Sequence, residues 1–375
     1  MNITKIHYHH LRIPLRLTFA QANQNTKLSD SVIVRLETDG GVLGYGEACP
    51  RAYVSGEDAA SVRQTMDKWK PSLFGASFAS LNDIREWVLL QVDQGIGLAA
   101  VCAIELALLD AWSKTHQIDL QDALAQQRSL TVLDYSGIIP YGKWEKLSAI
   151  VKHFTFKSWK LKAYDELALN EQRIKDVKNL MGEEVSIRMD ANAGWSLTNA
   201  RQQINAAMAL GVNSFEQAFD KLEDAITLRK EFGDCIQLMA DESLVTYADA
   251  EKLIESDACN HFSLKLSKNG GIFNSLRIYD LAQKAGIPCQ LSAHFGETSI
   301  LTAAGALFAS LVPTLSALEG ALGTYLLKED ICKTPMMIEV NGQFGQSELN
   351  YSGWPIQVDE MHLNRYSVRT EYWKK

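Results

Sequence analysis

The pattern of hydrophobic and polar positions changes about one third of the way along this 375-residue chain. Residues 1–125 open with two stretches in which apolar and polar residues alternate, as is typical of half-buried β-strands. Asp39, Gly40 and Gly41 lie between two apolar runs and predict a hairpin turn. Helical periodicity follows at residues 57–71, 81–92 and 98–114. Strands followed by helices predict an α+β domain over residues 1–125.

From residue 126 the pattern becomes a regular alternation of short apolar stretches and amphipathic helices. The expected strands are VLDYSGIIP, SWKLKAY, VSIRMDANA, VNSFEQAF, IQLMADES, HFSLKLSK, IPCQLSAHF and LSALEG. Strands that alternate with helices pair in parallel, and eight such units in roughly 200 residues predict a (β/α)8 barrel at residues 126–335. The remaining residues, 336–375, read as strand and loop, and we expect them to return to the N-terminal domain.

Composition and charge exclude several classes of protein. The net charge is −8 and no basic run occurs, which argues against a nucleic-acid or anionic-membrane partner. The most apolar segment, GLAAVCAIELALLDAW, is too short to span a bilayer and carries Glu105 and Asp110, so we expect a buried helix. The six cysteines form no CxxC pair and the N-terminus has no apolar leader, which favours a cytoplasmic protein.

Charged residues end five consecutive expected strands, where barrel enzymes place their chemistry. They are Lys162, Asp190, Glu216, Asp241 and Lys265, at successive spacings of 28, 26, 25 and 24 residues. We therefore expect these five side chains around one rim. Three converging carboxylates repel one another unless a cation lies between them, and hard oxygen ligands favour Mg²⁺, with Mn²⁺ as an alternative. Because no His or Cys occurs among these ligands, zinc is disfavoured.

Two lysines, Lys160 and Lys162, lie two residues apart in an expected strand and would point to the same face. Neighbouring ammonium groups lower each other's pKa, so Lys160 would tune Lys162 to act as a base near neutral pH. Lys265 would lie on the opposite side of the metal. Each residue alone has a plainer explanation, such as an exposed edge strand for the lysine pair, but five charged strand ends in sequence favour a catalytic rim.

The motifs KLK, MDAN, FEQ, ADES and LKLSKNGG, in this order, resemble the enolase superfamily, muconate-lactonizing-enzyme subgroup. The resemblance covers nearly the whole chain, since AVCAIELALLDAWSK is similar to a helix of that family's capping domain. It implies an α+β capping domain on a modified (β/α)8 TIM-like barrel. It also implies that Asp190, Glu216 and Asp241 bind the divalent metal, and that Lys162 and Lys265 form the acid/base pair.

The resemblance implies further roles around this centre. Lys160 would contact the substrate carboxylate, and Asn192 would support the metal ligands from outside. Two segments of the capping domain, residues 17–27 and 50–57, would close over the substrate and select it. Glu297 would match a glutamate of the family's seventh strand.

Several residues depart from the family pattern or have two interpretations. FEQA replaces the common FEQP, which leaves the expected ligand intact. His294 is unusual and is either a core histidine or a specificity contact. Arg51 either binds a distal carboxylate of the substrate or faces solvent. The eighth strand reads LEG around Glu319, where dipeptide epimerases carry Asp-x-Asp to hold the substrate ammonium, which weakens the dipeptide interpretation.

The expected function is a metal-dependent isomerase that abstracts or delivers a proton next to a substrate carboxylate through an enediolate. Muconate cycloisomerase is the best-matched activity, while dipeptide epimerase, N-acylamino-acid racemase and o-succinylbenzoate synthase-like activities stay open because they share the core residues. An acid-sugar dehydratase is disfavoured because strand six offers Lys265 in place of an aspartate partner for His294. A non-catalytic binding barrel is disfavoured because binding alone does not require two lysines. The resemblance also implies a small carboxylate substrate and a homo-oligomer, from dimer to octamer.

Overall fold

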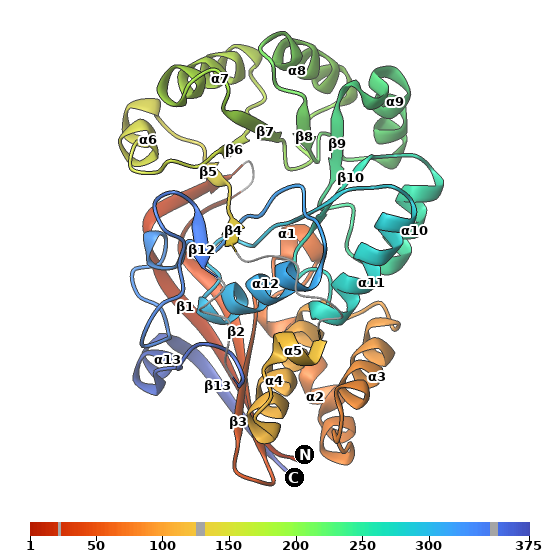
Figure 1. Cartoon of the computed structure of the whole chain (residues 1–375), viewed down its shortest axis with the longest axis vertical. Helices are drawn as coiled ribbons and strands as arrows, with labels where there is room; N and C mark the ends of the chain where they lie inside the picture. Colours follow the sequence, from red (N-terminus) through yellow and green to blue (C-terminus); the bar gives the residue numbers. More distant parts are fainter. Residues whose placement is uncertain (22–23, 125–131, 346–351) are drawn as a thin grey trace.

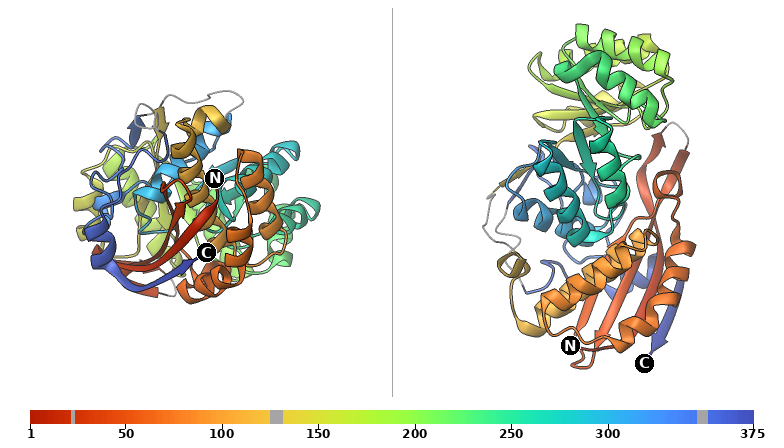
Figure 2. Two further views of the ribbon diagram at one scale, coloured as in Figure 1. Left: turned by 90° about the horizontal axis from the view of Figure 1, so that it is seen from below. Right: turned by 90° about the vertical axis from the view of Figure 1, so that its right-hand side faces the viewer.

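A computed structural model describes residues 1–21, 24–124, 132–345 and 352–375. The molecule is elongated, with an antiparallel sheet and its helices at one end and a curled parallel sheet with surrounding helices at the other (Figure 1). Both termini lie at the end formed by the antiparallel sheet, as Figures 1 and 2 show. The expected combination of an α+β cap and a TIM-like barrel is confirmed.

The cap is built on a four-stranded antiparallel sheet in the order β13-β1-β2-β3. Its strands are β1 (Ile3–Gln21), β2 (Gln24–Thr38), β3 (Leu43–Ala48) and β13 (Ser367–Lys374). The expected turn joins β2 to β3, where Gly41 N–H donates to Thr38 O at 3.0 Å and Gly41 has a positive φ of 77°. β13 pairs with β1, so the C-terminal end of the chain completes the sheet that its N-terminal end begins.

Three long helices belong to the cap: α2 (Ala59–Gly75) and α4 (Leu98–His116) pack on this sheet, and α3 (Leu81–Val92) packs on α4. They match the three expected helices within a few residues. α4 contacts β2 and β3 and is buried along almost its whole length, as its apolar sequence requires. Gly46 of β3 permits this close packing, because a Cβ there would lie 2.0 Å from Ala103 O of α4. Among the described residues, every helix falls short of the length and apolarity needed to cross a bilayer.

The barrel contains a seven-stranded parallel sheet in chain order, β5 to β11. The strands are β5 (Gly137–Ile139), β6 (Ser158–Lys162), β7 (Ser186–Asp190), β8 (Ser214–Glu216), β9 (Gln237–Ala240), β10 (His261–Leu264) and β11 (Cys289–Leu291). The helices between and after them are α6 (Trp144–Val151), α7 (Leu167–Met181), α8 (Leu197–Ala209), α9 (Leu222–Phe232), α10 (Tyr247–Glu255), α11 (Gly271–Lys284) and α12 (Ser299–Leu311).

The barrel differs from a regular (β/α)8 barrel at its two ends. The first expected strand splits into β5 and β4 (Val132–Asp134), which pairs antiparallel with β12 (Gln343–Gly345). The expected eighth strand is reduced to residues 316–319, where Glu319 N–H donates to Leu291 O at 2.9 Å. On the other side, Ser136 N–H donates to Leu318 O at 2.7 Å. This short segment therefore joins β11 to the chain just before β5 and closes the barrel.

Short helices complete the described structure: α1 (Ala52–Ser55), α5 (Leu120–Leu124), α13 (Glu360–Tyr366) and the 3-10 turns Gly233–Cys235 and Gly323–Tyr325. Buried carboxylates attach the cap to the barrel. Glu47 of β3 accepts hydrogen bonds from the backbone N–H groups of Thr298 and Leu301 at the start of α12. Glu105 of α4 accepts from Phe273 N–H at the start of α11. These contacts satisfy N–H groups that a helix start otherwise leaves without partners.

Candidate active site

The five charged residues expected at the barrel rim end five neighbouring strands. In the parallel register, Lys162 of β6 lies opposite Asp190 of β7, which lies opposite Glu216 of β8. Asp241 follows β9 directly, and Lys265 follows β10 directly. All five side chains are buried. The regular spacing in the sequence arises because each βα unit returns the chain to the same edge of the sheet.

Each lysine of this rim pairs with a carboxylate. Lys162 Nζ lies 2.6 Å from Asp190 Oδ2, and Lys265 Nζ lies 2.5 Å from Asp241 Oδ2. Lys160 Nζ lies 3.5 Å from Asp190 and 3.3 Å from Glu216. The structure thus brings together all six residues that the sequence analysis assigned to catalysis and metal binding.

The pKa shifts follow from burial and from these pairs. Burial alone would lower the pKa of Lys265, but the charge of Asp241 outweighs it and raises that pKa. For Asp241 burial acts the other way, and the charges of Lys265 and Lys268 bring its pKa well below the usual value. The pKa of Lys160 is raised, because Glu216, Glu319 and Asp190 outweigh its burial. Lys160 is therefore a charged group, and its tuning of Lys162 stays a prediction.

The sequence analysis missed several buried partners of this rim. Lys268 is buried, and its Nζ donates to Asp241 Oδ1 at 2.9 Å and to Ser263 O at 2.9 Å. Arg188 pairs with Glu216 at 3.3 Å and with Glu319. Local signals existed for both: Lys268 ends the KLSK motif, and Arg188 lies two residues before Asp190 on the same face of β7.

Glu319 lies in the eighth-strand segment, where a dipeptide epimerase would need a free carboxylate to bind the substrate ammonium. One of its oxygens lies 2.6 Å from Lys160 Nζ, and Arg188 pairs with the other. Two residues further along, Ala321 lines the active-site cavity and has no polar side chain. This edge of the barrel therefore offers no free carboxylate at these two positions.

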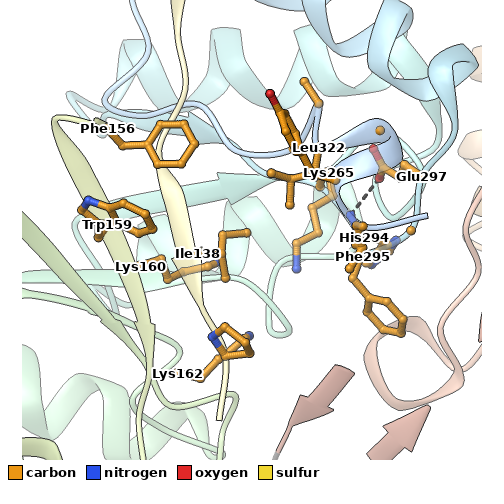
Figure 3. A pocket seen from close by; sticks show the side chains of 18 of the residues that line it. Ile138, Phe156, Trp159, Lys160, Lys162, Lys265, His294, Phe295, Glu297 and Leu322 are labelled. Carbon is orange, nitrogen blue, oxygen red and sulfur yellow. Dashed lines mark hydrogen bonds between the residues drawn. The ribbon is translucent and has the colours of Figure 1, made fainter. Parts of the chain in front are cut away.

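A cavity of about 180 Å³ lies over the rim (Figure 3). Its polar wall includes Lys160, Lys162, Lys265, Asn192 and Glu242. In Figure 3, Lys160 and Lys162 enter from the side of β6, and Lys265 enters from the other side. The cap contributes Tyr53 and Val54, both from α1.

Asn192 lies beside Lys162 and Asp190. Its Oδ1 accepts from Lys162 Nζ at 2.7 Å, and its Nδ2 donates to Glu242 Oε1 at 2.9 Å. Its own backbone N–H donates to Asp190 Oδ1 at 3.0 Å. Asn192 therefore orients both Lys162 and Asp190. Of the two expected closing segments, residues 50–57 reach the cavity through α1, whereas residues 22 and 23 of segment 17–27 lie outside the described residues.

Glu297 and His294 line the cavity next to Lys265. Glu297 Oε1 accepts from the backbone N–H of His294 at 2.8 Å, and burial raises the Glu297 pKa to about 8. Burial also lowers the pKa of His294 well below its usual value, so the ring is neutral. Neither ring nitrogen of His294 has a hydrogen-bond partner among the described residues. A neutral imidazole with both nitrogens unpaired can bind a ligand as donor and acceptor.

Arg51 corrects an expectation, because it neither faces solvent nor lines this cavity. Its side chain is 4% exposed. The guanidinium donates to the backbone oxygens of Asp30, Pro50 and Phe295 and lies 4.6 Å from the centre of the Phe295 ring. Arg51 therefore joins the cap loop to the barrel loop after β11, which is a structural role.

The residues expected to hold a divalent metal fit that task by their chemistry. Asp190, Glu216 and Asp241 offer hard oxygen donors at the ends of three adjacent strands, and the pKa values of Asp190 and Asp241 are lowered by their lysine partners. Across the described part of the chain, however, no three His, Cys, Asp or Glu side chains are already grouped as a metal site. Lysine Nζ atoms lie between these carboxylates, so metal binding requires their side chains to rearrange.

Comparison with known proteins shows similarity along both parts of the chain. Residues 3–125 match the mandelate racemase / muconate lactonizing enzyme N-terminal domain, and residues 145–360 match the enolase C-terminal domain-like family. L-Ala-D/L-Glu epimerase of Bacillus subtilis is 29% identical over 83% of this chain and 85% of its own length. N-succinyl-L-Arg/Lys racemase of Bacillus cereus is 27% identical over 81% of this chain and 83% of its own length. Muconate cycloisomerase 1 of Acinetobacter baylyi is 26% identical over 89% of this chain and 91% of its own length.

A solved structure of a dipeptide epimerase has the same fold as this chain. The dipeptide epimerase from Cytophaga hutchinsonii, complexed with Mg and the dipeptide D-Ala-L-Val, superposes with a TM-score of 0.86 at 24% identity. That match covers 99% of this chain and 100% of the other.

Proposed function

Because the chain belongs to the mandelate racemase and muconate lactonizing enzyme family of the enolase superfamily, and is an isomerase, we propose that it racemises or epimerises an amino-acid derivative. The proton would move at the carbon next to the carboxylate. Our sequence analysis ranked lactonization of muconate first, but the most similar curated relatives include epimerases and a racemase. We therefore place proton transfer between two faces of one carbon ahead of ring closure.

One observation carries this proposal: Lys162 and Lys265 border the same cavity from strands that have three other strands between them. Inversion at a carbon requires a base on one face and an acid on the other. Two amines that approach from different sides meet this requirement, whereas a single base suffices for ring closure or elimination.

The proposed steps use this chain's own groups. Lys162 Nζ as a free amine takes the α-proton from one face, and Lys265 Nζ as an ammonium delivers a proton to the other face. Asn192 holds Lys162 in position, and Lys160 contacts the substrate carboxylate with its ammonium. The reverse reaction exchanges the roles of the two lysines.

We expect Asp190, Glu216 and Asp241 to hold a divalent cation, with Mg²⁺ preferred and Mn²⁺ as an alternative. Bound there, the cation supplies positive charge that stabilises the negative charge developing on the substrate. Support comes from the donor chemistry of these residues and from the Mg that the C. hutchinsonii structure contains.

Other features stay proposals that rest on the family. We propose a functional division into a cap of residues 1–125, a catalytic barrel of residues 126–335 and a returning segment of residues 336–375. We also propose a cytoplasmic homo-oligomer, from dimer to octamer, with a small carboxylate substrate and without a nucleic-acid or membrane partner.

Deuterium exchange tests the proposed reaction. The protein is incubated in D₂O with Mg²⁺ and a panel of N-acyl amino acids, dipeptides and cis,cis-muconate, and α-deuterium uptake is followed by NMR. We expect metal-dependent exchange with both enantiomers of one amino-acid derivative. Lys162→Ala should lose exchange with one enantiomer and Lys265→Ala with the other.

Lys157→Ala is the matched control, because Lys157 lies just before β6 with its side chain 78% exposed. It should exchange both enantiomers at the wild-type rate. If Lys162→Ala and Lys265→Ala also keep exchange with both enantiomers, the proposed acid/base pair is wrong.

Cycloisomerisation of muconate remains the second candidate, and the state of Glu319 favours it over dipeptide epimerisation. Lys160 and Arg188 occupy the Glu319 carboxylate, so it is not free to bind a substrate ammonium. Muconate and N-acyl amino acids carry no ammonium group and avoid this problem. Formation of a lactone from muconate, without exchange of any amino-acid derivative, would establish the second candidate.

A further inference from the structure

The active-site cavity extends beyond the lysines that carry the proposed proton transfer. From the lysines it extends past Ile138 of β5 to a group of side chains under α6. We call this end the α6 chamber and define it by Leu147, Ile150, Val151, Phe154 and Phe156. Figure 3 shows Phe156 at one end of the pocket, Lys265 and His294 at the other, and Ile138 between them.

Aromatic rings fix the wall of the α6 chamber. The Phe154 and Phe156 rings are stacked with centroids 5.0 Å apart, and Phe156 meets Trp159 edge-on at 4.9 Å. Phe154 also meets Tyr325 edge-on at 5.0 Å, which connects the wall to the segment after Glu319. A Cβ at Gly137 would lie 2.4 Å from the Trp159 ring, so β5 packs directly on this wall. The wall of the chamber is therefore formed by aromatic rings that are held in place by packing against one another.

Charge is distributed unevenly along the cavity. The charged residues that line it are Lys160, Lys162, Lys265, Glu242 and Glu297, and all of them lie in barrel strands or in the loops that follow them. The five residues that define the chamber are all apolar. A charged group placed among the four buried members, Leu147, Val151, Phe154 and Phe156, would lose its hydration without gaining an ionic partner. Ile150 is 39% exposed, so the chamber also reaches the surface beside α6.

We propose that the α6 chamber binds an uncharged, apolar group of the substrate while the carboxylate lies at the lysines. The substrate class is then an α-amino acid whose α-nitrogen carries a hydrophobic acyl group, in preference to one whose acyl group ends in a second charge. This inference rests on the proposed function for the position of the carboxylate. The chamber's composition and its continuity with the lysine-lined cavity supply the rest.

Binding measurements on the Mg²⁺-loaded protein test the inference without relying on turnover. Dissociation constants are measured by calorimetry for N-acetyl-, N-butanoyl-, N-hexanoyl- and N-succinyl-L-alanine. Burial of each added methylene group should tighten binding by about fourfold until the chamber is full. N-succinyl-L-alanine has the carbon count of the butanoyl compound but ends in a carboxylate, and it should bind at least tenfold more weakly than that compound.

Two matched variants locate the effect. Ile150→Glu places a carboxylate at the open side of the chamber, where a charged side chain can stay hydrated, and it should abolish the dependence of binding on acyl length. Leu169→Glu makes a similar change on α7, where Leu169 is 48% exposed and does not line the cavity, and the dependence should persist.

The outcomes separate this inference from the proposed function. Exchange of α-deuterium with no dependence of binding on acyl length, or tighter binding of the succinyl compound, would overturn the inference and leave the reaction standing. Acyl-length dependence that Ile150→Glu abolishes, without any exchange, would support the chamber and overturn the proposed reaction. Equal loss in Ile150→Glu and Leu169→Glu would also overturn the inference.

Discussion

Individual residues at the rim hold buried charges by pairing them. Asp241 is fully buried, yet its two oxygens contact the ammonium groups of Lys265 and Lys268. Asp190 and Glu216 are held in the same way by Lys162 and Lys160. An ion pair in an apolar interior offsets its desolvation cost only while both partners are present. The stability of the rim should therefore depend on Lys268 as well, although this lysine is not expected to touch substrate.

Lys268→Met tests this dependence. The change leaves Asp241 with one ammonium partner fewer and should lower the free energy of unfolding by about 3 kcal/mol, as expected when one partner of a buried pair is lost. Urea unfolding in the presence of EDTA measures it. Lys157→Met removes a lysine from an exposed pair with Asp134, in which the two side chains are 78% and 51% exposed, and should change little. Equal effects of the two variants would contradict the argument.

In contrast to Lys268, His294 should contribute to substrate binding and not to stability. Its ring is buried and neither nitrogen has a described hydrogen-bond partner, which costs about 1–3 kcal/mol for such a group. His294→Leu should therefore leave stability unchanged or raise it, while the KM of the substrate increases because a ligand contact is lost. Thermal unfolding and steady-state kinetics measure the two effects. A clear loss of stability in His294→Leu would mark the residue as a core histidine.

Among the secondary-structure elements, two barrel helices start at N–H groups that donate hydrogen bonds to carboxylates of the cap. Glu47 accepts hydrogen bonds from three donor groups of Thr298 and Leu301 at the start of α12, and one of these groups is the Thr298 hydroxyl at 2.7 Å. Its burial is complete and raises its pKa to about 7. Burial likewise raises the pKa of Glu105, which accepts a hydrogen bond from Phe273 N–H at the start of α11, to about 8. The attachment of cap to barrel should therefore weaken as pH rises.

The sign of this pH effect follows from proton binding. Between the unfolded pKa of about 4.5 and the folded pKa of about 7, the folded state keeps a proton on Glu47 that the unfolded state has lost. The stability that Glu47 contributes is complete below this range and is lost as pH rises through it. Thermal unfolding at pH 5 to 8 should thus show Tm falling, and Glu47→Gln, which cannot ionise, should show a shallower fall. Parallel curves for the two proteins would contradict the prediction.

At the scale of the whole molecule, the barrel rim and the cap enclose one site. The rim carries three carboxylates whose negative charge lysines now balance, and the cap covers them with α1. A divalent cation that binds only the folded protein should stabilise the entire chain by mass action.

Mg²⁺ should therefore raise Tm, and EDTA should reverse the shift. With free Mg²⁺ 100-fold above its Kd, the expected stabilisation is about 2.7 kcal/mol. Glu216→Gln, which keeps the side-chain shape but removes one charged ligand, should shift the midpoint of the Mg²⁺ titration to higher concentration. Calorimetric scans over a Mg²⁺ series measure this, and an unchanged midpoint in the variant would exclude Glu216 as a ligand.

Features that depend on short-range physical chemistry could be predicted from the amino-acid sequence. Alternating apolar positions and the Asp39-Gly40-Gly41 turn were sufficient for the β2–β3 hairpin, and helical periodicity was sufficient for α2, α3 and α4. The equal spacing of charged strand ends predicted the rim, because a βα unit has a nearly constant length. These signals lie within single elements or repeat from one unit to the next.

Contacts between groups that are far apart in the chain depend on tertiary packing and could not be predicted in this way. Arg188 pairs with Glu319, 131 positions away. Glu47 accepts a hydrogen bond from Thr298 N–H, 251 positions away, at the start of α12. Arg51 was equally suited by sequence to solvent or to substrate, and packing of the cap loop on Phe295 buried it. The α6 chamber likewise joins side chains from β5, α6 and the segment after Glu319. Such contacts depend on how whole elements pack, because no local pattern records which distant side chain will fill the space opposite.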